Sequence, residues 1–169
     1  MAEGLTLETH VPLHAATARY FDAGGAFAAA LTLAAGIPLP RPLAAAAGRS
    51  LVLAWLGPRE TLALCADGAR LEELAAQLTE VPGGQVVDLR GGLTALRLEG
   101  ARAGEFLSRL GGFGTVPQPG EARRGRLADV PVLALSLRPG EVQLVVDRAY
   151  AAHLLEWVRG TLEDFEEER

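Results

Sequence analysis

Lysine is absent from this 169-residue sequence, so its 16 basic side chains are all arginines. The formal net charge is −5, and the only dense basic run is Arg123, Arg124 and Arg126. Binding to nucleic acid needs an extended positive surface, which this chain does not supply. We therefore expect no nucleic-acid partner. We interpret the run as a solvated strand face, with a phosphate or partner site as the alternative.

Cysteine occurs once, at Cys65, so the chain has no second cysteine with which to form an internal disulfide. Secreted domains more often carry paired cysteines, and we therefore expect a cytoplasmic protein. Cys65 falls inside an apolar run, which predicts a buried, inert thiol rather than a nucleophile.

Residues that could carry chemistry are also few. None of the three serines lies in a nucleophile elbow or in evident register with a histidine and an acid. Pro12 lies between His10 and His14, which disfavours a helical metal pair, and no cysteine nearby supplies a third ligand. We expect no catalytic residue and no metal site, and the chain is not expected to be an enzyme by itself.

Long hydrophobic runs are missing as well. The most apolar stretch covers residues 26–35, whereas a membrane span needs about 20 residues. Glu3 and Glu8 precede it and a basic segment does not, which is unlike a signal peptide. We expect no membrane segment.

The chain divides by composition into three parts. Residues 1–25 contain Pro12, Gly24 and Gly25 and show no sustained period, so we expect an N-terminal arm with little structure of its own. Residues 26–163 are expected to form a single domain. Residues 164–169 are expected to form an acidic tail that frays, because acidic groups oppose the dipole at a helix C-terminus.

Hydrophobic periodicity predicts the elements of the domain. Helices are expected over 26–35, after Asp67, over 103–110 and after Asp147, and strands over 51–56, 61–65, 85–90, 93–98, 123–127, 132–137 and 142–146. The strands over 85–90 and 93–98 are expected to form a hairpin through Gly91 and Gly92. Leu133, Leu135 and Leu137 are expected to share a face with Val142, Leu144 and Val146.

This order predicts an α+β fold with antiparallel sheets and helices packed on them. The middle of the chain is expected to contain a ferredoxin-like unit. A cross-strand pair of Asp88 and Arg97 is the polar pairing to test as a small-ligand site, with a solvated ion pair as the alternative. Tyr150 and Trp157 either seal the edge of the domain or present an aromatic strip to a partner.

Five segments of the sequence resemble one family. LVLAWLGPRETLAL at 51–64, after AGIPLPRP at 35–42, resembles the WLGPDEWL segment and the proline-rich entry of the gamma subunits of heterotetrameric sarcosine oxidase. VVDLRGGLTALRLEGARAGEFLSRL at 86–110 resembles a block shared with the folate-binding fold of the glycine cleavage T-protein. Similarity continues over 119–135 and 144–160. Arg59, Thr61 and Arg90 depart from the family pattern.

The resemblance implies an aminomethyltransferase-like (T-protein) folate-binding-like domain and an accessory subunit without its own cofactor. Its partners would be flavin-bearing alpha and beta subunits and a small delta subunit. Such a complex oxidatively demethylates sarcosine, or a related N-methyl amino acid, and passes the one-carbon unit to tetrahydrofolate. Asp88, Arg97 and Arg124 are the candidate ligand contacts in this chain. The alternatives are a stand-alone folate-binding protein of this fold and an unrelated interaction domain.

Overall fold

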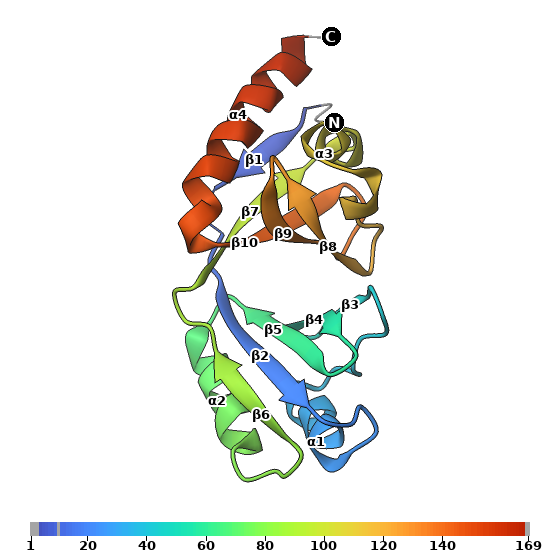
Figure 1. Ribbon diagram of the computed structural model, residues 1–169, viewed down its shortest axis with the longest axis vertical. Helices are drawn as coiled ribbons and strands as arrows, with labels where there is room; N and C mark the ends of the chain where they lie inside the picture. The colour runs from blue at the N-terminus through green and yellow to red at the C-terminus, as the bar shows by residue number, and fades with distance from the viewer. Residues whose placement is uncertain (1–3, 10, 168–169) are drawn as a thin grey trace. The chain divides into compact units, whose positions relative to one another are not determined.

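The computed structural model describes residues 4–9 and 11–167, and the chain forms two compact units. The middle unit comprises Pro12–Gly91, and the terminal unit combines Met1–Val11 with Gly92–Arg169. Each unit contains a five-stranded antiparallel sheet and its own helices (Figure 1). The α+β class with antiparallel sheets and packed helices is therefore confirmed.

The middle unit has a ferredoxin-like arrangement. Its sheet has the order β3-β4-β5-β2-β6, so β5 lies between β2 and β4, and β2 lies between β5 and β6. These interleaved connections define a split βαβ pattern. The bounds along the chain are β2 (His14–Tyr20), α1 (Ala26–Ala35), β3 (Ala45–Ala47), β4 (Val52–Gly57), β5 (Glu60–Cys65), α2 (Gly68–Leu78) and β6 (Gly84–Asp88).

Local chemistry explains where the two helices of this unit begin and end. Gly36 adopts φ 67° after α1, a left-handed conformation that glycine takes without strain, and its N–H bonds to the last turn. The side chain of Asp67 accepts a hydrogen bond from Ala69 N at 3.0 Å, which confirms the predicted cap of α2.

The core of the middle unit lies between the helices and one face of the sheet. Phe27 and Leu31 from α1 and Leu71, Leu74 and Leu78 from α2 are buried there. Close packing leaves no room at the start of β6. A Cβ atom on Gly84 would lie 2.4 Å from the ring of Phe27, so glycine is needed at this position.

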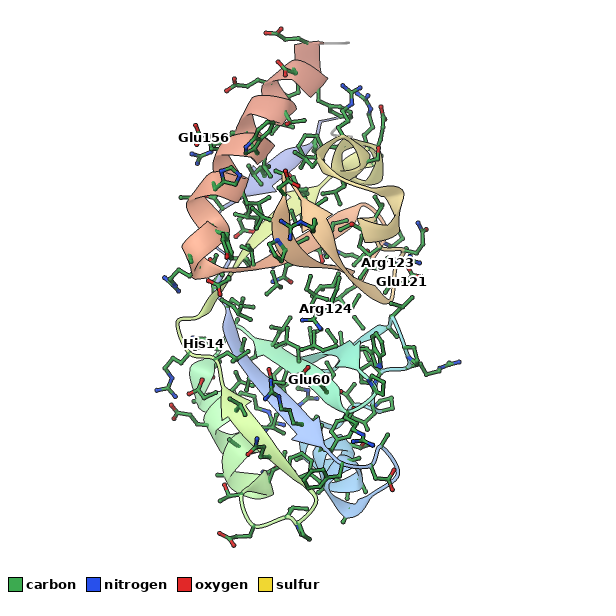
Figure 2. The ribbon with its side chains drawn as sticks, in the orientation of Figure 1. His14, Glu60, Glu121, Arg123, Arg124 and Glu156 are labelled. Carbon is green, nitrogen blue, oxygen red and sulfur yellow. The ribbon has the colours of Figure 1, made fainter. Side chains whose placement is uncertain are left out.

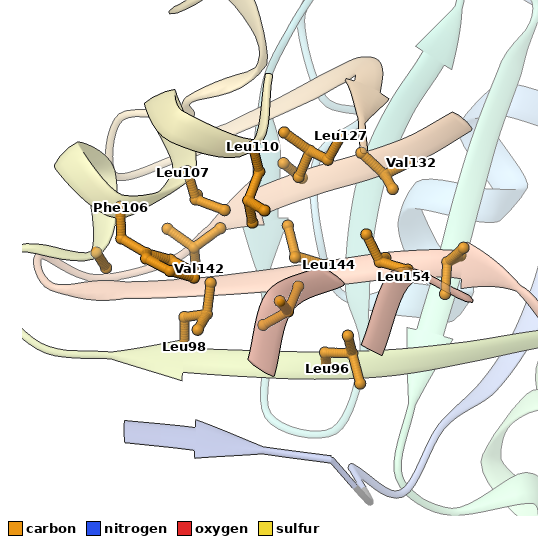
Figure 3. Close-up of a cluster of buried hydrophobic side chains, with 14 of the residues drawn as sticks. Leu96, Leu98, Phe106, Leu107, Leu110, Leu127, Val132, Val142, Leu144 and Leu154 are labelled. Atoms are coloured by element: carbon orange, nitrogen blue, oxygen red, sulfur yellow. The ribbon is translucent and has the colours of Figure 1, made fainter. Parts of the chain in front are cut away.

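In the terminal unit one sheet, of order β1-β7-β10-β9-β8, combines strand β1 with four strands from the second half of the chain. Its elements are β1 (Thr6–Glu8), β7 (Leu93–Glu99), α3 (Ala103–Leu110), η1 (Phe113–Thr115), β8 (Glu121–Leu127), β9 (Val130–Ser136), β10 (Glu141–Asp147), η2 (Arg148–Tyr150) and α4 (Ala151–Glu167). The core packs Phe106, Leu107 and Leu110 of α3 and Leu154 and Val158 of α4 against one face of the sheet (Figure 3).

Two predicted segment boundaries are wrong. The described part of residues 1–25 does not form an arm with little structure, because β1 pairs with β7 and β2 lies inside the middle sheet. Residues 26–163 do not form a single domain, because each unit has its own sheet and hydrophobic core. Alternation in β2 is hard to recognise because alanines occupy both of its faces. Residues 1–3, 10, 168 and 169 lie outside the described residues.

The predicted hairpin through Gly91 and Gly92 is also wrong. β6 pairs with β2, whereas β7 pairs with β1 and β10, so the two strands belong to different sheets. Glycines at a turn allow the chain to change direction, but they do not determine which strand the next segment pairs with.

In the meander, the predicted face assignment is wrong by one residue. Leu144 pairs with Ala134, and Val146 pairs with Val132. Val132 and Ala134 therefore share the core face with Leu144 and Val146, and Leu133 and Leu135 take the other face. A one-residue change of register exchanges all side chains between faces.

The acidic tail differs from the prediction over its described residues. α4 continues through Glu167, because Phe165 is buried and holds the last turns of the helix on the core. The ring of Phe165 lies 5.5 Å from that of Phe106 in an edge-to-face contact. Over residues 4–9 and 11–167, no helix has the length and apolar character that a membrane span requires.

Candidate functional site

Asp88 and Arg97, the predicted polar pair, belong to different units and bond to different partners. Asp88 ends β6 in the middle unit, and its Oδ1 accepts a hydrogen bond from Arg90 N at 2.7 Å. The Arg90 guanidinium bridges the Asp88 carboxylate at 3.2 Å and the Glu72 carboxylate at 2.7 Å. These groups are well exposed, and exposed ion pairs contribute only about 0–1 kcal/mol. Asp88 therefore organises a surface turn.

Arg97 lies on β7 in the terminal unit. It pairs across the strands with Glu8, and its Nη1 donates to the Glu8 carboxylate at 3.0 Å. Its Nε is buried and makes no hydrogen bond to the described residues. The geometry thus supports the ion-pair alternative for Arg97, with Glu8 in place of the predicted partner Asp88.

The arginine run lies on β8, at one edge of the terminal sheet. Arg123 donates two hydrogen bonds to the Glu121 carboxylate, at 2.7 and 3.0 Å, and Figure 2 shows the two side chains together. These bonds lower the pKa of Glu121 to about 2. Arg124 is exposed on the same strand, and Arg126 donates to the carbonyl of Asp129. Arg123 and Arg126 are thus engaged within β8 and its following turn.

Two serine hydroxyls and the Cys65 thiol donate to backbone carbonyls instead of to bases, and the thiol donates to Asp67 O at 2.7 Å. Ser108 Oγ donates to Glu105 O at 2.6 Å, and Ser136 Oγ donates to Arg138 O at 3.0 Å. Cys65 is buried, and burial raises the pKa of its thiol. An activated nucleophile needs a base within hydrogen-bond reach or a lowered pKa. These three contacts supply neither.

Metal-binding groups do not converge within residues 4–9 and 11–167, where no three His, Cys, Asp or Glu side chains come together. His14 begins β2 and packs on Gly68 at the start of α2. His153 lies on the exposed side of α4. His10 lies outside the described residues, so the prediction for it stays a prediction.

A hollow of about 500 Å³ opens on the middle unit where β2 ends. Its walls include Arg19, Phe21 and Arg59, and Arg19 is bonded to Glu60 at 2.9 Å. The ring of Phe21 is 77% exposed. Sequence reasoning missed this surface because it treated residues 1–25 as an arm. A strand ending in Tyr20-Phe21 before the turn at Gly24 and Gly25 was the available signal.

The outer side of α4, together with Tyr150 of η2 just before it, forms a second exposed surface. Tyr150 is 49% exposed and Trp157 is 54% exposed, so neither seals the edge of its unit. The aromatic strip expected as one of two alternatives is therefore present. Figure 2 shows Glu156 on the outward side of the same helix. Large exposed aromatic residues are enriched at protein interfaces, so the arrangement favours binding.

Comparisons with known proteins indicate one family. A family model described as "Sarcosine oxidase, gamma subunit family" matches residues 19–163. The sarcosine oxidase subunit gamma of Corynebacterium sp. (strain P-1) is 31% identical over 156 residues, which cover 89% of this chain and 76% of that protein.

Solved structures give the same result for the fold. A chain of the heterotetrameric sarcosine oxidase from Corynebacterium sp. U-96 superposes with a TM-score of 0.82 and 26% identity, covering 98% of this chain and 87% of that chain. The glycine cleavage system aminomethyltransferase T from Bartonella henselae superposes with a TM-score of 0.63 and 15% identity, covering 93% and 46%. This second likeness confirms the predicted T-protein-like fold.

Proposed function

This chain belongs to the sarcosine oxidase gamma subunit family, and from that premise we propose that it is a non-catalytic accessory subunit of a sarcosine oxidase-type complex. The observation that carries the proposal is the superposition of 98% of the chain on a chain of a heterotetrameric sarcosine oxidase, with a TM-score of 0.82. The hydrogen bonding of the serines and the burial of Cys65 support a role without chemistry of its own.

The proposed partners are alpha, beta and delta subunits of such a complex. Flavins and tetrahydrofolate are proposed to bind to these partners and not to this chain, and the reaction of the complex is the oxidative demethylation of sarcosine or a related N-methyl amino acid. The complex is proposed to act in the cytoplasm, which agrees with a chain that carries a single cysteine.

Co-expression with the partner subunits tests this function. The chain should co-purify with a flavin-containing assembly at fixed stoichiometry, whereas the chain purified alone should show no flavin absorption. A control assembly without this chain shows whether flavin content depends on it. A chain that remains separate from the assembly, or that carries flavin alone, would contradict the proposal.

A stand-alone folate-binding protein is the alternative that the T-protein-like fold raises. Saturable binding of tetrahydrofolate by the isolated chain, weakened by Asp88→Ala, would support that alternative. We expect a flat titration, because the Asp88 carboxylate already bonds to the backbone and side chain of Arg90. Isothermal titration calorimetry of the wild-type chain and of Asp88→Ala makes the comparison.

A further inference from the structure

α4 presents one continuous exposed face on the terminal unit. His153, Trp157, Gly160 and Asp164 follow one another at spacings of four, three and four residues, so they lie on the same side of the helix. All four are exposed, and they line a shallow hollow of about 550 Å³. The buried side of α4, with Leu154, Val158 and Phe165, faces the core, so this outer face is not needed for folding.

The exposed face of α4 contains a glycine, Gly160, whose presence the fold of the chain does not explain. It lies well inside α4, where glycine is unfavourable by about 1 kcal/mol relative to alanine. A Cβ atom there would meet no atom within 4 Å, so packing inside the chain does not require glycine. The missing side chain leaves space directly beside Trp157, one helical turn away. Close approach by another molecule explains why this space is kept open.

The charge of the helix indicates the kind of molecule. α4 carries five acidic residues and one arginine, Arg159. Glu156, Glu163 and Asp164 border the hollow beside the indole of Trp157. An aromatic face flanked by carboxylates attracts a guanidinium or an ammonium group, and repels anionic lipid or nucleic acid. A positive group near the C-terminal end would also relieve the conflict between these acids and the helix dipole.

On the inner side of the same helix, two arginines outside α4 already stack on an aromatic ring of the helix. The guanidinium carbons of Arg102 and Arg109 lie 4.0 and 4.7 Å from the ring centroid of Phe165. On the outer side Trp157 offers a larger ring, 54% exposed, with its edge-to-face contact to His153 at a centroid distance of 6.4 Å. Indole binds cations more strongly than the other aromatic side chains.

We propose that the outer face of α4 docks a basic segment of a partner subunit, which places an arginine or lysine over Trp157 and passes over Gly160. This inference rests on the proposed function, since the partner is a subunit of the same complex. Complementary charge surrounds the docked cation, and the absent side chain of Gly160 allows close backbone approach.

Labelling Trp157 tests the contact directly. The chain contains two tryptophans, so Trp55→Phe leaves Trp157 as the single site for 5-fluorotryptophan. Mixing the labelled chain with the unlabelled complex that lacks it should shift and broaden the ¹⁹F resonance, because an exposed indole becomes buried. A resonance that keeps its position in a mixture shown by size-exclusion chromatography to contain the assembled complex would overturn the inference. So would a shift produced by self-association of the chain alone.

A matched pair of charge variants tests the chemistry. Asp164→Asn and Glu166→Gln each remove one negative charge near the end of α4, but only Asp164 borders the hollow. Asp164→Asn should weaken association about fivefold to tenfold, with a reduced dependence on salt, while Glu166→Gln should leave it nearly unchanged. Equal effects of the two variants would contradict a localised docking face.

Gly160→Ala separates binding from folding. The isolated chain should become more stable, with a melting temperature raised by about 2–4 °C, because alanine is the better helix former. Association should weaken about tenfold, because the methyl group occupies the space needed by the partner. Unchanged association would overturn the inference. Failure of the wild-type chain to assemble with the complex would contradict the proposed function. If the wild-type chain assembles and none of these variants changes the strength of association, only the docking face is contradicted.

Discussion

At the scale of single residues, most polar side chains that stand out in the sequence serve local structure. Asp67 caps α2, Asp88 stabilises the turn after β6, and Arg97 joins two strands through Glu8. Glu121 and Arg123 form a doubly bonded pair on β8. Each of these groups has a partner within a few residues or on the adjacent strand. Their energetic effects are therefore local, and they can be tested one at a time.

The Glu121–Arg123 pair predicts a specific pH dependence. Because the hydrogen bonds from Arg123 lower the pKa of Glu121 from 4.5 to about 2, the pair stabilises the fold above pH 4.5 and loses this effect as the pH falls towards 2. Glu121→Gln should reduce the free energy of unfolding by about 0.2–1 kcal/mol at pH 6. Urea unfolding should show this difference shrinking at pH 3, and a difference independent of pH would contradict the assignment.

At Gly84, the close packing around the backbone predicts that any added side chain destabilises the fold. A methyl group there would lie 2.4 Å from the Phe27 ring and 2.5 Å from the carbonyl oxygen of Arg19, so Gly84→Ala should cost about 1–3 kcal/mol of unfolding free energy. Gly114→Ala is the matched control, because its Cβ would meet no atom within 4 Å. Thermal unfolding of both variants makes the comparison, and similar melting temperatures would refute the close contact.

At the scale of elements, helix α4 has one face buried against the core and the opposite face exposed. Leu154, Val158 and Phe165 hold it on the sheet, while Trp157 stays exposed. The inner contacts extend to the last turns, since Phe165 packs on Phe106 and beneath Arg102. The acidic end of the helix is therefore ordered by apolar packing even though its charges oppose the helix dipole.

Phe165→Ala tests this anchoring. Removal of a fully buried ring should cost about 3–5 kcal/mol of unfolding free energy and should release the last turns of α4. Hydrogen exchange of the backbone amides in that segment should accelerate most. Trp157→Ala, on the exposed side, should change stability by less than about 1 kcal/mol. A small effect of Phe165→Ala would mean that this segment is held by other contacts.

Local patterns predicted most elements but not all of their partners. The cap at Asp67, the apolar stripe of α3 and the end of α1 at Gly36 are set by nearby residues, and the structure has them where predicted. Strand partners are chosen by contacts distant in sequence, so the path beyond Gly91 and Gly92 could not be predicted. For the same reason Asp88 and Arg97 were paired wrongly. The helical spacing of Tyr150 and Trp157 left open whether they seal an edge or stay exposed, and the structure has both exposed.

At the scale of the whole molecule, each of the two folded units presents exposed surfaces suited to binding. Exposed aromatic and apolar side chains occur in both units, at Phe21 and Leu33 in the middle unit and at Tyr150 and Trp157 in the terminal unit. Ser108, Ser136 and Cys65 donate hydrogen bonds to backbone carbonyls, whereas the exposed aromatic side chains are of the kind enriched at protein interfaces. Membership in the gamma subunit family is consistent with binding within a sarcosine oxidase complex.

The most direct test is sedimentation velocity of this chain mixed with a flavin-containing complex that lacks it, recorded both at a protein wavelength and at a flavin wavelength. The chain alone should sediment without flavin absorption, and addition to the complex should give saturable, stoichiometric co-sedimentation with no change in flavin per complex. Flavin that travels with the isolated chain, or two species that sediment independently at all ratios, would contradict the account.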